Sequence, residues 1–190
     1  MNAAATLIAE KGFKRTSVDD VIERAELSGK SHFYHYFKSK EELGLEVLGR
    51  QFEAFAERGL VILREPLIHP IERLHLFIDS LVALQTERGF KVGSPFGNLA
   101  TEMADLHEGF RERLVLVFDR WAAQLEALLW EARPHLATDV DTRRLSRFLI
   151  ATLEGALMMS KVSRDAEMLR AIAADLKRFV ATHVREGAAA

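Results

Sequence analysis

The chain has 190 residues, 48% of them hydrophobic, which is enough for one good core and a small second one. A net charge of −2 and a pI near 6.4 argue against a protein that coats nucleic acid without selectivity. The absence of cysteine excludes disulfides, thiolate catalysis and zinc knuckles. With no signal sequence and no run near the ~20 apolar residues that span a bilayer, we expect a cytoplasmic protein without membrane contact.

Helical periodicity covers almost the whole chain, and no alternating strand pattern with hairpin signals is present. The first predicted helix has Ala4, Leu7 and Ile8 on its inner side and ends at Gly12. We therefore predict an all-α fold of about nine helices. They cover approximately residues 2–11, 18–25, 29–37, 40–63, 70–87, 96–104, 106–133, 139–160 and 165–185.

The second and third predicted helices have the spacing of a helix-turn-helix. Thr16 and Ser17 offer hydroxyl caps, and two acids follow in the first turn. The segment Leu27-Ser28-Gly29 breaks the apolar pattern, because glycine tolerates the backbone of a sharp reversal and Ser28 can cap the next helix. Two short helices are thus expected to meet at a steep angle.

The third helix has two faces of different chemistry. Phe33, Tyr36 and Phe37 are expected to pack inward. The opposite face carries hydrogen-bond donors at helical spacing, and residues 28–40 contain no acid; residues 11–40 hold seven Lys or Arg against four Asp or Glu. Such a surface suits a DNA major groove flanked by phosphates. The donors on this face are Ser31, Tyr34, His35 and Lys38.

These segments resemble the DNA-binding domain of the TetR family of transcriptional regulators. The resemblance rests on Glu10-Lys11-Gly12-Phe13, Thr16-Ser17-Val18, Ile22, Ala25 and the run from Tyr34 to Leu43. It implies phosphate contacts by Thr16 or Ser17, Tyr34, His35 and Lys40, with Lys38 on the same surface, and base-edge contacts by Lys30, Ser31 and His32. This chain is one residue longer than the family pattern near Gly29. The sequence also begins without the basic segment that family members usually carry before the first helix. We expect either that this basic arm is missing or that the start of the chain was placed too late.

The resemblance extends into the second half of the chain. The segment Gly93-Ser94-Pro95-Phe96-Gly97-Asn98-Leu99-Ala100 is similar to one TetR branch in which a cysteine precedes the proline, and Leu153-Glu154-Gly155-Ala156 also matches. Here Ser94 occupies the cysteine position, so thiol sensing is not available. The family organisation implies a DNA-binding domain over 1–45 and a ligand-binding and dimerisation domain over 46–190.

An effector pocket and a dimer interface are expected in that second domain. Aromatic and methionine side chains can line an apolar cavity, although such residues at helical spacing are more often plain core. The candidate ligand-binding residues are Phe96, Asn98, Phe118, Trp121 and Met158, with Trp130, Met159, His75 and His107 as further possibilities. A seam of Leu169, Ile172, Leu176, Phe179 and His183 predicts that the last two helices pair with a second copy; alternatively, they close the core of one monomer.

No residue set suggests catalysis. Glu72 and His75 form a Glu-x-x-His motif without the second copy that a di-iron site needs, so neither a metal site nor a cofactor is expected. Two functions from different classes remain. The first is a homodimeric regulator, most naturally a repressor, that binds a palindromic DNA operator and is released by a small-molecule effector. The alternative is a helical-bundle carrier or enzyme with a cofactor in its apolar cavity.

Overall fold

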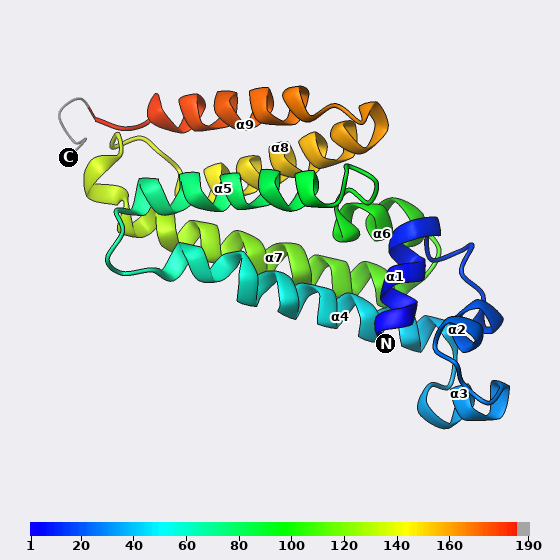
Figure 1. The fold of residues 1–190 in the computed structure, drawn as a ribbon. Coiled ribbons are helices and arrows are strands. Elements are labelled where there is room, and N and C mark those ends of the chain that lie inside the picture. The colour runs from blue at the N-terminus through cyan, green and yellow to red at the C-terminus, as the bar shows by residue number, and fades with distance from the viewer. Residues whose placement is uncertain (186–190) are drawn as a thin grey trace. The chain divides into compact units, whose positions relative to one another are not determined.

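A computed structural model describes residues 1–185, and that part of the chain is almost entirely helical (Figure 1). An isolated bridge between Leu136 and Val184 is the only strand-like pairing in this range. The α-helices of the described residues are α1 (Asn2–Lys11), α2 (Val18–Arg24), α3 (Lys30–Tyr36), α4 (Lys40–Arg58), α5 (Pro70–Glu87), α6 (Pro95–Met103), α7 (Glu108–Glu131), α8 (Thr142–Ser163) and α9 (Ala166–Ala181). Short 3-10 helices cover Leu60–Arg64 and Arg133–His135. The predicted all-α fold of nine helices is confirmed.

The boundaries follow local signals where these are strong. Pro70 begins α5, as predicted, because its ring presets the helical φ angle and its missing N–H is not needed there. Our expectation that the fourth helix reaches residue 63 was wrong. The α-helix ends at Arg58, and a 3-10 helix continues from Leu60 after Gly59.

The helices form two compact units. Of the described residues, the first unit contains 1–54 together with 94–117, and the second contains 55–93 and 118–185. The first unit therefore contains α1, α2 and α3, most of α4, all of α6 and the beginning of α7. Its amino-terminal core is built from Ala4, Leu7, Val21, Phe33, Leu43 and Val47.

The second unit buries the apolar stripes predicted for the later helices. Trp121, Phe77 and Leu125 are fully buried, and α9 packs against both α5 and α8. Arg73 is buried as well, and its guanidinium donates to the Leu63 carbonyl and pairs with Glu131, so this charge is partnered. Among the described helices, none is both long and apolar enough to cross a membrane.

Candidate nucleic-acid interface

The start of α2 is fixed by a capping box. The Asp20 N–H donates to Ser17 Oγ at 3.0 Å, and the Asp20 carboxylate accepts from the Ser17 N–H at 2.6 Å. Lys11 Nζ lies 2.8 Å from the same carboxylate. The Lys11 ammonium first, and then the Ser17 donors, hold the pKa of Asp20 far below its usual range. The carboxylate therefore remains charged, which suits the positive end of the helix.

The turn between α2 and α3 uses two left-handed backbone positions. Glu26 has φ +52° and Gly29 has φ +144°, a value that favours glycine. Gly29 is also the N-cap of α3 and offers no side-chain cap. Our expectation that Ser28 caps α3 was wrong, because its hydroxyl lies 3.3 Å from Nδ1 of His32 instead. The extra residue that we predict near Gly29 from the family resemblance would fall in this turn.

The inner face of α3 packs against α1, α2 and the start of α4, and these four segments together are called the DNA-binding head below. Phe33 is 1% exposed and packs in the amino-terminal core, with Phe37 partly buried beside it. The expectation that Tyr36 also points inward was wrong, since 63% of it is exposed. Its ring lies on the surface, 5.6 Å from that of His32 and 5.0 Å from that of His35.

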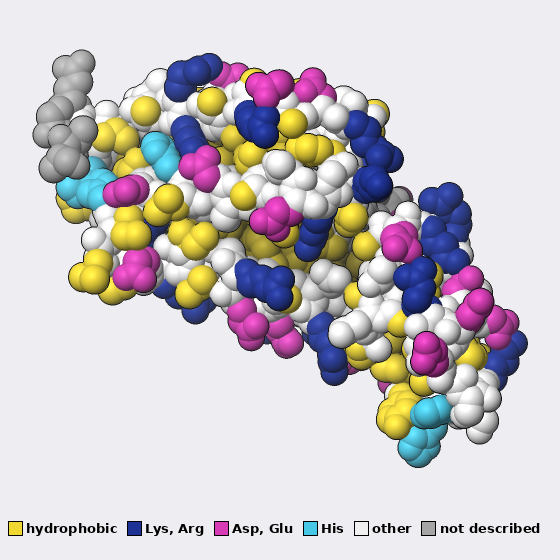
Figure 2. Space-filling model, in the orientation of Figure 1, with side chains coloured by type: hydrophobic (Ala, Val, Ile, Leu, Met, Phe, Trp, Pro, Cys, Tyr) yellow, Lys and Arg dark blue, Asp and Glu magenta, His cyan; other side chains and the backbone are white. Residues whose placement is uncertain are grey.

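The outer face of α3 leaves its donors free. Ser31, Tyr34 and His35 are exposed on this face, and Lys38 is exposed just beyond the end of α3. Within residues 1–185, none of these four side chains forms a hydrogen bond or an ion pair. Figure 2 shows histidine and hydrophobic side chains together over this part of the head. Lys30, another predicted contact, is exposed and lies 3.2 Å from Asp19. This surface can donate to DNA without first breaking strong internal contacts.

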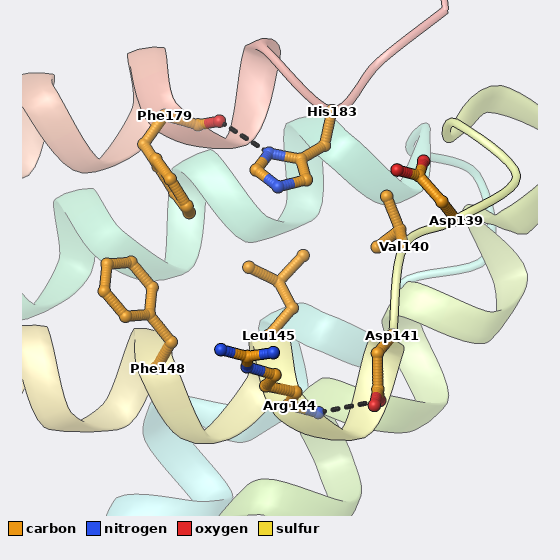
Figure 3. Close-up of a pocket in the computed structure, with 8 residues that line it drawn as sticks. All are labelled: Asp139, Val140, Asp141, Arg144, Leu145, Phe148, Phe179 and His183. Carbon is orange, nitrogen blue, oxygen red and sulfur yellow. Dashed lines mark hydrogen bonds between the residues drawn. The ribbon is translucent and has the colours of Figure 1, made fainter.

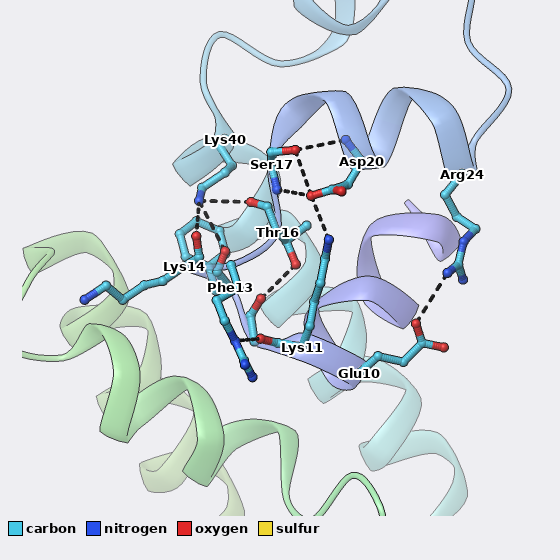
Figure 4. Close-up of polar contacts among 11 residues, drawn as sticks. Glu10, Lys11, Phe13, Lys14, Thr16, Ser17, Asp20, Arg24 and Lys40 are labelled. Atoms are coloured by element: carbon cyan, nitrogen blue, oxygen red, sulfur yellow. Dashed lines mark hydrogen bonds and ion pairs between the residues drawn. The ribbon is translucent and has the colours of Figure 1, made fainter.

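The remaining predicted contacts are used inside the protein. Thr16 is buried, and its hydroxyl donates to the Gly12 carbonyl at 2.7 Å. Lys40 Nζ donates to three carbonyls, those of Phe13 (3.2 Å), Lys14 (3.4 Å) and Thr16 (3.1 Å), and lies 4.5 Å from the Phe13 ring centre (Figure 4). Together with the capping Ser17, these side chains hold the turn between α1 and α2. Their contact with phosphate stays a prediction.

Sequence reasoning missed one contributor to this turn. Glu102 of α6 accepts hydrogen bonds from the backbone N–H groups of Phe13 and Lys14, at 2.8 and 2.6 Å. The partners are 88 and 89 residues apart in the chain. Glu102 lies near the end of a short helix with no local motif that marks it, so no signal in the sequence could have found it.

The predicted ligand-binding residues are divided between the two units. Phe96 and Asn98 belong to the first unit, and Phe96 stacks near Phe52. Phe118, Trp121 and Met158 belong to the second, where Trp121 is 1% exposed but Met158 is 57% exposed. Phe118 lines a shallow surface hollow with residues of α7 and α8. Ser94, at the family's cysteine position, caps α6 by accepting from the Gly97 N–H.

Two helices joined by a tight turn, with free donors on the second, define a helix-turn-helix DNA-binding protein. Residues 1–47 match the family described as bacterial regulatory proteins, tetR family, and residues 70–176 match the tetracyclin repressor-like carboxy-terminal domain. The chain belongs to the TetR family of transcriptional regulators. It is a ligand-responsive regulator of transcription and not an enzyme, and the carrier alternative is not favoured.

Several regulators are similar to this chain over most of its length. The transcriptional regulator AcuR of Cereibacter sphaeroides is 28% identical over 181 residues, which is 94% of this chain and 82% of AcuR. The transcriptional repressor NemR of Escherichia coli is 28% identical over 182 residues, or 93% of this chain and 89% of NemR. The repressor DhaR of a Mycobacterium species is 26% identical over 162 residues, covering 84% and 79% of the two chains.

Solved structures agree in fold. The regulatory protein TetR from Rhodobacter sphaeroides superposes with a TM-score of 0.86 at 28% identity, covering 93% of this chain and 94% of that one. The reduced form of E. coli NemR superposes with a TM-score of 0.83 at 25% identity, covering 99% and 96%. The similarity therefore extends through both units of the chain.

Proposed function

We propose that this protein is a repressor that binds a palindromic operator as a homodimer and leaves it when a small molecule binds. The observation that carries this proposal is the outer face of α3 together with Lys38 just after it, four exposed donors that have no hydrogen-bond or ion-pair partner within the described chain. The relatives DhaR and NemR are named as repressors. A protein with this role works where the DNA is, which supports a cytoplasmic location.

The side chains that we predict to contact DNA fall into two groups: those that are exposed, and those that form hydrogen bonds within the protein. The nine predicted contacts are Thr16, Ser17, Lys30, Ser31, His32, Tyr34, His35, Lys38 and Lys40. We assign base or phosphate contact to the exposed Ser31, Tyr34, His35 and Lys38, whose donors are free, and to Lys30, which is exposed but lies 3.2 Å from Asp19. Thr16, Ser17 and Lys40 serve DNA binding chiefly by holding the backbone of the turn.

The operator proposal is tested by fluorescence anisotropy with labelled duplexes covering the region upstream of the protein's own gene. A repressor should bind tightly to a duplex from that region that contains a palindrome. Its half-sites should lie about one helical turn apart, or ~34–36 Å, when the two heads are related by a two-fold axis. The transcript from that region should rise when the protein is deleted. A fall in the transcript would identify an activator.

We propose that the homodimer forms through α8 and α9. One face of α8 is apolar and open to solvent, and a Cβ on Gly155 would meet no atom within 4 Å, so a partner backbone can approach closely. Phe148 of α8 and Phe179 of α9 stack with ring centres 4.8 Å apart beside a hollow at the start of α8 (Figure 3). The open apolar face consists of Phe148, Ala151, Gly155, Met158, Met159 and Val162.

The burial of the predicted seam supports a smaller set of α9 residues for this proposed interface. Leu169 and Leu176 of the predicted seam are buried within the monomer, so they close its own core. Ile172 is partly buried, and Phe179 is exposed beside the open face of α8. The seam is thus divided between the two roles that the sequence left open.

Phe148→Glu tests this interface, because it places a charge in the proposed apolar contact. We expect a monomer in light scattering and weaker operator binding. Leu67→Glu is the matched control, since Leu67 is 91% exposed and lies outside α8 and α9; this variant should stay dimeric. A dimer that survives Phe148→Glu would reject the interface.

We propose that the effector binds in the second unit next to Trp121. Trp121 Nε1 is buried and has no hydrogen-bond partner among the described residues, and an unpaired buried donor costs about 1–3 kcal/mol. The rings of Phe55 and Phe77 lie 4.9 and 6.3 Å from the Trp121 ring. An apolar molecule with a carbonyl oxygen would satisfy this donor and pack on the rings.

Intrinsic fluorescence tests the effector site. The only other tryptophan is Trp130, which is largely exposed, so Trp130→Phe leaves Trp121 as the single reporter. A panel of aldehydes, ketones and esters that release the operator should change the Trp121 emission at the same concentrations. Release of DNA without a change in that emission would place the effector elsewhere.

A further inference from the structure

The turn between α1 and α2 is held from two sides by side chains of later helices. The amide N–H groups of Phe13 and Lys14 donate to the two oxygens of Glu102 in α6. The carbonyls of Phe13, Lys14 and Thr16 accept from Lys40 in α4. Hydrogen bonds to charged groups are the stronger kind, so this short segment is fixed more firmly than a surface turn normally is.

The backbone at Gly12 makes room for the carboxylate. Gly12 has φ +87° and ψ 161°, a conformation that is essentially restricted to glycine. A Cβ added there would lie 3.1 Å from both oxygens of Glu102. The glycine thus permits both the reversal of the chain and the close approach of Glu102.

The Phe13 side chain fixes the other end of the turn. Its ring centre lies 4.9 Å from that of Phe110 in α7, and Gly44 of α4 leaves the space that both rings fill. Phe13 is almost fully buried. Backbone and side chain of one residue are therefore anchored by α4, α6 and α7 together.

The backbone of Lys14 is fixed by its hydrogen bonds to Glu102 and Lys40. Its side chain is exposed and extends away from the hydrogen-bond network around the turn (Figure 4). Its ammonium has no partner within residues 1–185. It follows the anchored Phe13 directly and precedes the N-cap of α2 by three residues. A free cation at this point of a helix-turn-helix is well placed for a DNA phosphate.

We propose that Glu102 is a positioning residue for DNA binding, because its carboxylate fixes the α1–α2 turn so that Lys14 contacts a phosphate. The DNA-binding head is then completed by a residue of α6, outside the amino-terminal helices. The sign of the effect separates this role from simple electrostatics. An acid near DNA repels phosphate, so its removal alone should strengthen binding, whereas loss of a positioning residue should weaken it.

Glu102→Gln is the direct test, since it removes the charge and keeps one acceptor. We expect the affinity for a random-sequence duplex to fall about tenfold, the size expected for one lost charge-assisted hydrogen bond. Asp105→Asn is the control, because Asp105 is exposed nearby and makes no hydrogen bond or ion pair within the described chain. It should bind DNA as well as the parent or slightly better. The random duplex keeps this test independent of the operator.

A double-mutant cycle with Lys14→Ala tests the connection between the two residues. Lys14→Ala alters only an exposed side chain and should lower the slope of log affinity against log salt concentration by about one. Glu102→Gln should lower the same slope, and the double variant should bind no worse than Glu102→Gln. Thermal denaturation shows that each variant is folded. If Glu102→Gln is too unstable, Glu102→Asp, which shortens the side chain, takes its place.

Three results would overturn the proposal. The first is binding by Glu102→Gln that equals or exceeds that of Asp105→Asn. The second is an unchanged salt slope in Lys14→Ala. The third is full additivity in the double variant, which would mean that the carboxylate does not act through Lys14.

Discussion

The α1–α2 turn and the helix α3 lie in the same head but treat their polar groups in opposite ways. In the turn, backbone amides and carbonyls are bonded to Glu102 and Lys40. On the outer face of α3, the side-chain donors have no partner within residues 1–185. The contrast teaches that positioning and recognition need different side chains. A donor that holds the fold is not free for DNA, and a free donor adds nothing to stability until DNA is present.

The largest effect should come from the packing below the turn. A Cβ in Gly44→Ala would lie 2.4 Å from Phe13 Cε2 and 2.7 Å from Phe110 Cζ, so the rings must move. We expect the free energy of unfolding to fall by about 3 kcal/mol, the upper end for overpacking. Urea denaturation measures it. The control is Gly49→Ala on the same helix, because a Cβ there would lie 3.9 Å from Arg113 Nη1, an ordinary van der Waals distance. Equal stability in both variants would refute the packing account.

Tyr34→Ala should separate recognition from stability. Tyr34 is 53% exposed and its hydroxyl is free, so the fold should keep its stability while operator affinity falls about tenfold, or about 1.4 kcal/mol. Anisotropy titration and thermal denaturation measure the two quantities. Leu67→Ala is the control, because Leu67 is 91% exposed and lies in the second unit, outside the DNA-binding helices. Unchanged affinity in Tyr34→Ala would remove Tyr34 from the contact surface.

The two lysines near the end of α3 sharpen the comparison. Lys40→Ala should lower the free energy of unfolding by about 1 kcal/mol, because three carbonyls lose their donor. It should also weaken binding to matched and mismatched sites by the same factor. Lys38→Ala should leave stability unchanged and lower the salt slope by about one. A stable Lys40→Ala variant would show that Lys40 is not needed to hold the turn.

The smallest effect concerns His75 in the second unit. Burial, followed by the Lys177 charge, lowers the pKa of His75 below 6.5, although Asp79 and Glu72 act in the other direction. The unfolded chain then takes up the proton first, so stability is complete above pH 6.5 and declines as the pH falls toward the folded-state pKa. His75→Gln should flatten this decline in urea denaturation at pH 7.5 and 5.5. The same slope in both proteins would contradict the shift.

Local signals in the sequence were sufficient for most of the fold. Gly12 ends α1, Pro70 begins α5, and Ser17 with Asp20 caps α2, because each depends on residues within one helical turn. The helical spacing of Ser31, Tyr34 and His35 likewise predicted one exposed face, whereas the expectation that Lys38 continues it was wrong, because α3 ends at Tyr36 and Phe37 is extended.

Contacts between distant segments were not predictable in this way. Glu102 acts on amides 88 and 89 residues away, and Lys40 has the same chemistry whether it contacts a phosphate or three carbonyls. Tyr36 and Met158 match apolar patterns yet lie on the surface. Side-chain type restricts the possible roles of such residues, and only the packed chain selects among them.

The most direct test of the account is an anisotropy titration of the protein and of Tyr34→Ala against DNA from upstream of its own gene, beside a scrambled duplex, at several salt concentrations. We predict tight binding to the native fragment only, a salt slope of several phosphates, and loss of the preference in Tyr34→Ala. Equal weak binding of both proteins to both duplexes would contradict a recognition role for the outer face of α3.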